Sequence, residues 1–99
     1  MTITKKTENE LLTMELDGRL DTNTAPSLEQ EINNSITEEV KKLVLDFKQL
    51  QYISSAGLRV LLATQKKMNK QGCMVIKNVN EMIMDVFHVT GFVDILTVE

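Results

Sequence analysis

The chain has 99 residues, of which 42% are hydrophobic and 25% charged, and its formal net charge is −3 at pH 7. These values are typical of one soluble globular domain and exclude a disordered or low-complexity chain. The acidic balance gives no broad attraction to nucleic acid, and no apolar stretch approaches the roughly 20 residues of a membrane span. We therefore expect a single domain over residues 1–99, cytoplasmic, with no direct nucleic-acid partner and no membrane insertion.

The first elements predicted along the chain are two strands joined by a short turn. Leu12, Met14 and Leu16 alternate with polar residues, which is the period of a strand with one face in water. A weaker strand surrounds Ile3, and only the polar segment 8–10 separates the two. A hairpin is expected, so the sheet begins antiparallel.

A helix and a buried strand come next. Apolar residues recur at helical spacing over residues 24–36, and Pro26 is tolerated because it falls in the first turn. The apolar run 43–47 is typical of a central strand covered on both faces. From there the chain is expected to turn through residues 48–53.

The second half repeats the alternation of helix and strand. A helix is expected over 55–70, ended by Gly72 in the left-handed conformation. A buried strand follows over 73–76, and its Cys73, the only cysteine, is interpreted as a small buried hydrophobe in a reducing compartment. Asn80 is expected to cap a third helix that ends at Gly91, and a last short strand lies within 92–98.

This order predicts an α/β fold. Strands that alternate with helices of 10 to 16 residues form parallel sheets with helices packed against them. The expected architecture is a mixed, largely parallel sheet with an antiparallel N-terminal edge, packed against helices.

The segment most informative about function is Ser54-Ser55-Ala56-Gly57, where a central strand meets the start of a helix. Free backbone N–H groups and the positive end of the helix dipole meet there, so a phosphate on a serine hydroxyl would be stabilised. The alternative is that Ser54 or Ser55 only caps the helix. Capping and modification are compatible, and both remain open at this point.

Three segments together resemble the sequence signature of the STAS family, named for sulfate transporters and anti-sigma-factor antagonists. They are Gly18-Arg19-Leu20-Asp21 with the following Ala25-Pro26 and Leu28, Leu45-Asp46-Phe47, and the run from Tyr52 to Leu61. The match covers nearly the whole chain in similar order and spacing, and it is closest to the anti-sigma-factor antagonist type.

The resemblance implies a binding module controlled by phosphorylation. Such a protein binds an anti-sigma factor that is also a serine kinase, phosphorylation ends the complex, and a serine phosphatase resets it. The family's phosphoacceptor is the serine two places before the glycine, which here is Ser55. Family members usually carry an aspartate immediately before it, whereas this chain has Ser54, which is therefore a competing hydroxyl.

Asp21, Gly57 and Arg59 are further candidates for the neighbourhood of the phosphosite, and Asp46 is similar to a recurrent acid of the family. By resemblance, Asp21 lies near the acceptor and orients its hydroxyl or a nucleotide-bound metal of the kinase, or else it is a turn aspartate. Gly57 admits either a partner or the preceding strand. Arg59 contacts a partner or is a solvated charge. For Asp46 we favour a structural role, bonding backbone amides of the following turn.

The sequence leaves two other classes of function to compare with this binding module. A STAS scaffold subunit of a transporter or of a stress-signalling complex fits the same fold, and gene neighbours would distinguish it. An enzyme is not expected, because a nucleophile elbow needs glycine two places before its serine and Ile53 stands there. The only histidine, His88, lies on another predicted helix, and one Cys with one His makes no ligand cluster, so we expect no catalytic residue, cofactor or metal.

Overall fold

In the computed structural model, which describes residues 1–99, four strands and three α-helices alternate after an initial hairpin. The elements are β1 (Thr2–Glu8), β2 (Leu11–Leu20), α1 (Ala25–Ser35), β3 (Lys42–Ile53), α2 (Ser55–Asn69), β4 (Cys73–Lys77), α3 (Glu81–Thr90) and the short 3-10 helix η1 (Phe92–Asp94). The predicted order of strands and helices is thus confirmed up to the third helix.

The four strands form one mixed sheet in the order β1-β2-β3-β4. β1 pairs antiparallel with β2, and the pairs β2–β3 and β3–β4 are parallel. The hairpin closes at the pair Glu8 and Leu11, with Asn9 at a φ of 55°, a conformation that asparagine tolerates in tight turns. The predicted sheet and its antiparallel N-terminal edge are confirmed.

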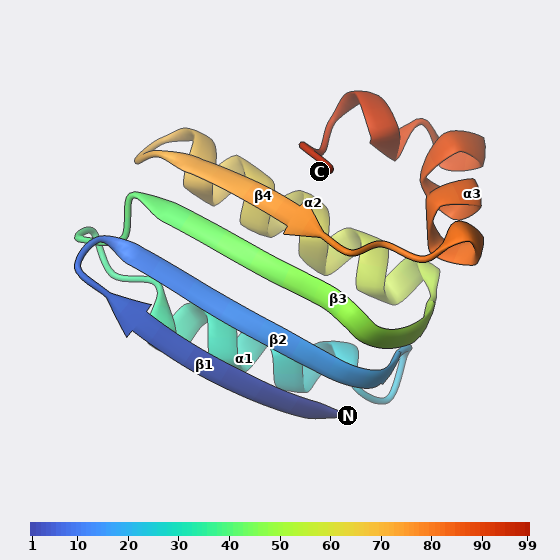
Figure 1. Cartoon of the computed structure of the whole chain (residues 1–99), viewed down its shortest axis with the longest axis horizontal. Coiled ribbons are helices and arrows are strands. Elements are labelled where there is room, and N and C mark those ends of the chain that lie inside the picture. Colours follow the sequence, from blue (N-terminus) through green and yellow to red (C-terminus); the bar gives the residue numbers. More distant parts are fainter.

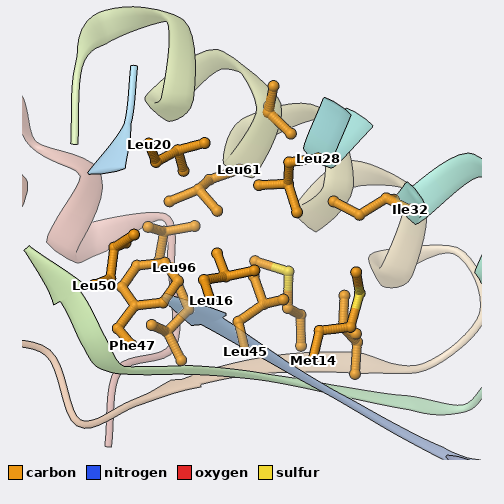
Figure 2. Close-up of a cluster of buried hydrophobic side chains, with 14 of the residues drawn as sticks. Met14, Leu16, Leu20, Leu28, Ile32, Leu45, Phe47, Leu50, Leu61 and Leu96 are labelled. Carbon is orange, nitrogen blue, oxygen red and sulfur yellow. The ribbon is translucent and has the colours of Figure 1, made fainter. Parts of the chain in front are cut away.

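The hydrophobic core lies between the sheet and the helices α1 and α2, and α3 adds Ile83 and Phe87 to it. Figure 1 shows α1 and α2 behind the sheet, with α3 beside the carboxyl end of β4. Alternate residues of β2 and β3 point toward these helices, as Figure 2 shows for a buried cluster of Met14, Leu16, Leu45, Phe47, Leu28, Ile32 and Leu61. All of these side chains are at most 2% exposed, so the parallel strands are held by one continuous apolar layer.

β3 differs from its prediction in two ways. No helix crosses the near face of the sheet in Figure 1, so the expectation of a strand covered on both faces is wrong. Val44, on that face, is buried between its cross-strand neighbours Thr13 and Val75 instead. β3 also continues to Ile53, with irregular register against β2, where a turn was expected over 48–53.

Two predictions about the start of β4 are also wrong. Cys73 is exposed, because Met74 and Ile76 take the inward positions and strand alternation turns Cys73 to the other face. Gly72 does not have a positive φ. It is required for a close approach instead, since a Cβ there would overlap the carbonyl oxygen of Lys41.

The last predicted strand does not form. Gly91 ends α3, as expected, and has a φ of 79°, but the chain then enters η1, where the amide of Ile95 donates to the carbonyl of Phe92 at 2.9 Å. The segment reaches the sheet only at its end, where Val98 forms an isolated bridge with Ile76 through backbone hydrogen bonds of Thr97 and Glu99. Local 3-10 hydrogen bonds have replaced strand pairing over most of the segment.

Candidate functional site

The predicted serine pair lies at the carboxyl end of β3, where α2 begins. The last residues of the parallel strands β2 and β3, Leu20 and Ile53, are paired, and the amide of Ser54 donates to the carbonyl of Leu20 at 2.9 Å. Ser55 is the first residue of α2 and is exposed. The strand-turn-helix arrangement expected from the sequence is therefore present.

The two serines differ sharply in their surroundings. Ser54 occupies the N-cap position, yet its side chain makes no capping hydrogen bond, and its Oγ is buried without a partner. The side chain of Ser55 is in solvent. The alternative that Ser54 serves as an ordinary cap therefore has no hydrogen bond to support it.

The first turn of α2 has free backbone donors. The earliest helical hydrogen bond runs from the amide of Leu58 to the carbonyl of Ser54 at 3.0 Å, and the amides of Ser55, Ala56 and Gly57 have no protein acceptor. The first turn contains no acidic residue. Three N–H groups without an acceptor and the positive end of the helix dipole thus lie beside the Ser55 hydroxyl, which favours an anion at this place.

Asp21 lies at the same end of the sheet, one residue beyond Leu20. Its Oδ1 accepts hydrogen bonds from the amides of Asn23 at 2.9 Å and Thr24 at 3.1 Å. Desolvation raises the pKa of this carboxyl, but the amides of Thr24 and Asn23, the Thr24 hydroxyl and the charge of Arg19 outweigh it, so the pKa lies below its usual value. One carboxylate oxygen is thus committed to the turn before α1, which supports the turn alternative for Asp21.

An arginine–tyrosine pair borders the site and was not predicted. The guanidinium carbon of Arg19 lies 4.2 Å from the centre of the Tyr52 ring, and Nε of Arg19 is 3.9 Å from Oδ2 of Asp21. Arg19 and Tyr52 are paired across the parallel strands. Each is the residue before the end of its strand, so aligning the two predicted strand ends would have brought them together.

Gly57 is buried under the carboxyl ends of β2 and β3. A Cβ at this position would lie 2.7 Å from Cγ of Leu20 and 2.9 Å from Cγ1 of Ile53. Such contacts are too short for carbon atoms. Of the two alternatives, close approach of the strands is the one that the packing shows, and the glycine lets α2 start directly against the sheet.

Arg59 lies on the exposed side of α2, beside a shallow groove of about 250 Å³ between α1 and α2. The groove is lined by Thr22, Ala25, Pro26, Glu29, Ala56, Arg59, Val60 and Ala63. Arg59 forms no ion pair within 4.0 Å, although Glu29 lines the same groove. The groove therefore offers small apolar side chains with an unpaired guanidinium at its rim.

The remaining candidates take structural or peripheral places. Oδ1 of Asp46 accepts from the amide of Lys48 at 2.9 Å and from Nδ2 of Asn78 at 3.0 Å, so the favoured structural role is confirmed. His88 is exposed on α3. No three His, Cys, Asp or Glu side chains come together as a metal site, and no helix has the length and apolar character needed to cross a membrane.

Comparisons with known proteins agree with this geometry. Residues 2–99 match the model of the STAS domain. BtrV of Bordetella bronchiseptica, provisionally named an anti-sigma factor antagonist, is 36% identical over 84 residues, which are 84% of this chain and 72% of that protein.

Two solved structures share the fold. An anti-sigma factor antagonist from Mycobacterium paratuberculosis superposes with a TM-score of 0.88 at 25% identity, over 98% of this chain and 83% of that one. The Bacillus cell fate determinant SpoIIAA in its phosphorylated form superposes with a TM-score of 0.76 at 18% identity, over 99% and 91% of the two chains.

Proposed function

This chain belongs to the STAS domain family, and from that membership we propose that it is an anti-sigma-factor antagonist switched by phosphorylation of Ser55. In the unmodified form it binds an anti-sigma factor that is also a serine kinase, and so releases a sigma factor for transcription. The phosphorylated form does not bind. The printed names of BtrV and of the mycobacterial structure support the antagonist assignment.

The observation that carries the proposal is the exposed hydroxyl of Ser55 beside three unpaired amides of α2. A phosphoserine carries about −1.5 to −2 charges at pH 7. At this helix start the charge meets backbone donors and the positive end of the dipole, worth about 0.3–1 kcal/mol. We therefore expect the fold to accommodate the modified side chain without rearrangement.

The switch is an ordinary phosphoryl transfer. The Ser55 oxygen loses its proton and attacks the γ-phosphorus of ATP bound to the kinase, and ADP leaves. A serine phosphatase reverses the modification with water and releases inorganic phosphate. The antagonist itself supplies the acceptor and its position, which agrees with a regulatory protein and not an enzyme.

The docking face that we propose is the groove between α1 and α2 together with the turn that precedes each helix. Its occupant is the anti-sigma factor, which would place a small apolar side chain between Pro26 and Ala63 and a carboxylate against Arg59. Asp21 and Ser54 shape the adjoining edge through the backbone. Gly57 contributes by keeping α2 close to the sheet.

Ser54 is the less suitable acceptor on this geometry. Its Oγ is buried, so a kinase would have to unwind the start of α2 to reach it. Mapping of the phosphorylated residue distinguishes the two hydroxyls, since only the Ser55 oxygen is accessible in the folded protein.

Site mapping tests the proposal. The protein is incubated with ATP and the serine kinase that it captures from lysate of its own organism, and the phosphorylated peptide is sequenced by mass spectrometry. We expect one phosphate, on Ser55, which is lost in Ser55→Ala and retained in the matched control Ser54→Ala. Phosphate on Ser54 alone would refute the assignment of the acceptor, and no phosphate with a verified partner kinase would favour the scaffold function.

A further inference from the structure

Arg59 stands four residues after Ser55 on the same helix. Residues at this spacing occupy one face, with Cβ atoms about 5–6 Å apart. Side chains in a helix also lean toward its N-terminus, so the long Arg59 side chain extends back toward the first turn. The order of the two residues, acceptor first and cation second, is the favourable orientation for an ion pair along the helix dipole.

The guanidinium of Arg59 has no competing partner within the protein. It is exposed, takes part in no ion pair or side-chain hydrogen bond, and the first turn of α2 has no acidic residue. Arg19, the other arginine, is already engaged by the Tyr52 ring and the carboxylate of Asp21. Of the two arginines, only Arg59 is free to bind a new anion.

We propose that Arg59 binds the phosphate on Ser55, together with the free amides of the first turn of α2. A guanidinium group can donate two parallel hydrogen bonds to the oxygens of one phosphate, a bidentate geometry that a lysine cannot reproduce. The proposal rests on the proposed function only in taking Ser55 as the acceptor.

One consequence reaches beyond the modified atom. Arg59 lines the groove between α1 and α2, whereas Ser55 does not. A phosphate that binds the guanidinium removes the unpaired positive charge from the rim of the groove. Phosphorylation would thus alter the docking face one helical turn away, in addition to the charge that it adds at the helix start.

The experiment uses full-length protein with phosphoserine incorporated at position 55 during synthesis, so it needs neither kinase nor partner. The second ionisation of the phosphate, with an ordinary pKa of about 6, is followed by phosphorus NMR during a pH titration. Arg59→Gln is expected to raise that pKa by about 0.3, because it removes a cation that favours the dianion.

Two matched controls remove the same charge elsewhere. Lys66→Gln changes α2 eleven residues after Ser55, roughly 16 Å along the helix axis, where salt screens the interaction. Arg19→Gln removes the engaged arginine. Lys66→Gln is expected to leave the phosphate pKa within about 0.1 of the parent value. Arg19→Gln is expected to shift it less than Arg59→Gln, because the charge of Arg19 is paired with Asp21. Arg59→Lys is expected to fall between Arg59→Gln and the parent.

An equal shift in Arg59→Gln and Lys66→Gln, or a larger shift in Arg19→Gln, would overturn the proposal. Circular dichroism of each variant establishes that it is folded, so that a null result counts against the pairing. Failure here would leave the acceptor assignment intact, because site mapping is independent of the pairing. Failure of partner binding would leave this pairing intact.

Discussion

The starts of α2 and α3 lie at the same end of the sheet, but only α3 has an N-cap side chain that accepts a hydrogen bond from a first-turn amide. In α3, Oδ1 of the N-cap Asn80 accepts from the amide of Ile83 at 2.8 Å, and Glu81 adds an acidic residue to the first turn. Asn80 also donates through Nδ2 to the carbonyl of Leu50 at 3.1 Å. In α2, the N-cap Ser54 makes no such bond.

This difference separates a structural helix start from one that is open to a ligand. The third residue of α3, Ile83, is buried in the core, whereas the third residue of α2, Gly57, has no side chain. α3 is therefore fixed by its cap and by an apolar anchor. α2 is positioned by close contact with the strand ends, which leaves its amides and the Ser55 hydroxyl available.

The largest expected effect comes from adding a side chain at Gly57. Gly57→Val would force carbon atoms into Leu20 and Ile53, and we expect it to lower the free energy of unfolding in urea by about 3 kcal/mol. Gly57→Ala should show a smaller loss of the same sign. Full stability of Gly57→Val would mean that α2 does not depend on this contact for its position.

Removal of the Asn80 cap of α3 should lower the free energy of unfolding by a smaller amount. Asn80→Ala deletes the bond to the Ile83 amide and the bond to the Leu50 carbonyl, and we expect a loss of about 1–2 kcal/mol in the same urea titration. Asn80→Asp, which retains the acceptor for the Ile83 amide and loses the donor to Leu50, should recover part of the loss. Wild-type stability in Asn80→Ala would remove the distinction between the two helix starts.

The equivalent change at the start of α2 should have little effect on the free energy of unfolding. Ser54→Ala removes a hydroxyl that caps nothing, and we expect a change in unfolding free energy below about 0.5 kcal/mol. A loss as large as that of Asn80→Ala would show that Ser54 does cap α2 in solution. It would then argue against free amides beside Ser55.

The smallest effect concerns the turn before α1. The pKa of Asp21 is lowered in the folded protein, so the stability it contributes is present above its ordinary value of 3.8 and is lost as pH falls through the folded value. Asp21→Asn should therefore flatten the decrease in melting temperature below about pH 4, while leaving the value at pH 7 slightly lower. If the melting temperatures of the parent and Asp21→Asn fall equally below pH 4, the turn does not stabilise the ionised carboxylate of Asp21.

Sequence reasoning succeeded where periodicity and turn chemistry act locally. The hairpin around Asn9, the cap at Asn80 and the helix end at Gly91 each follow from a residue type that favours a turn, a cap or a helix end. The position of Ser55 at the start of a helix followed from a strand run meeting a helix run. These features need no knowledge of distant contacts.

The errors arose where distant parts of the chain decide the outcome. Gly72 ends no helix in the left-handed form, because its role is set by the carbonyl of Lys41, far along the sequence. The pairing of Arg19 with Tyr52 depends on the register between two strands. Likewise the segment after Gly91 has strand-forming residues, but its local 3-10 hydrogen bonds prevail.

The most direct test of the central claim is the affinity of the cognate anti-sigma factor for two preparations of the protein, measured by calorimetry. One preparation is unmodified, and the other carries phosphoserine at position 55. The account predicts that the phosphate weakens binding at least about tenfold, equivalent to about 1.4 kcal/mol, while both preparations unfold at similar urea concentrations. Equal affinity for the two would contradict a switch at the start of α2.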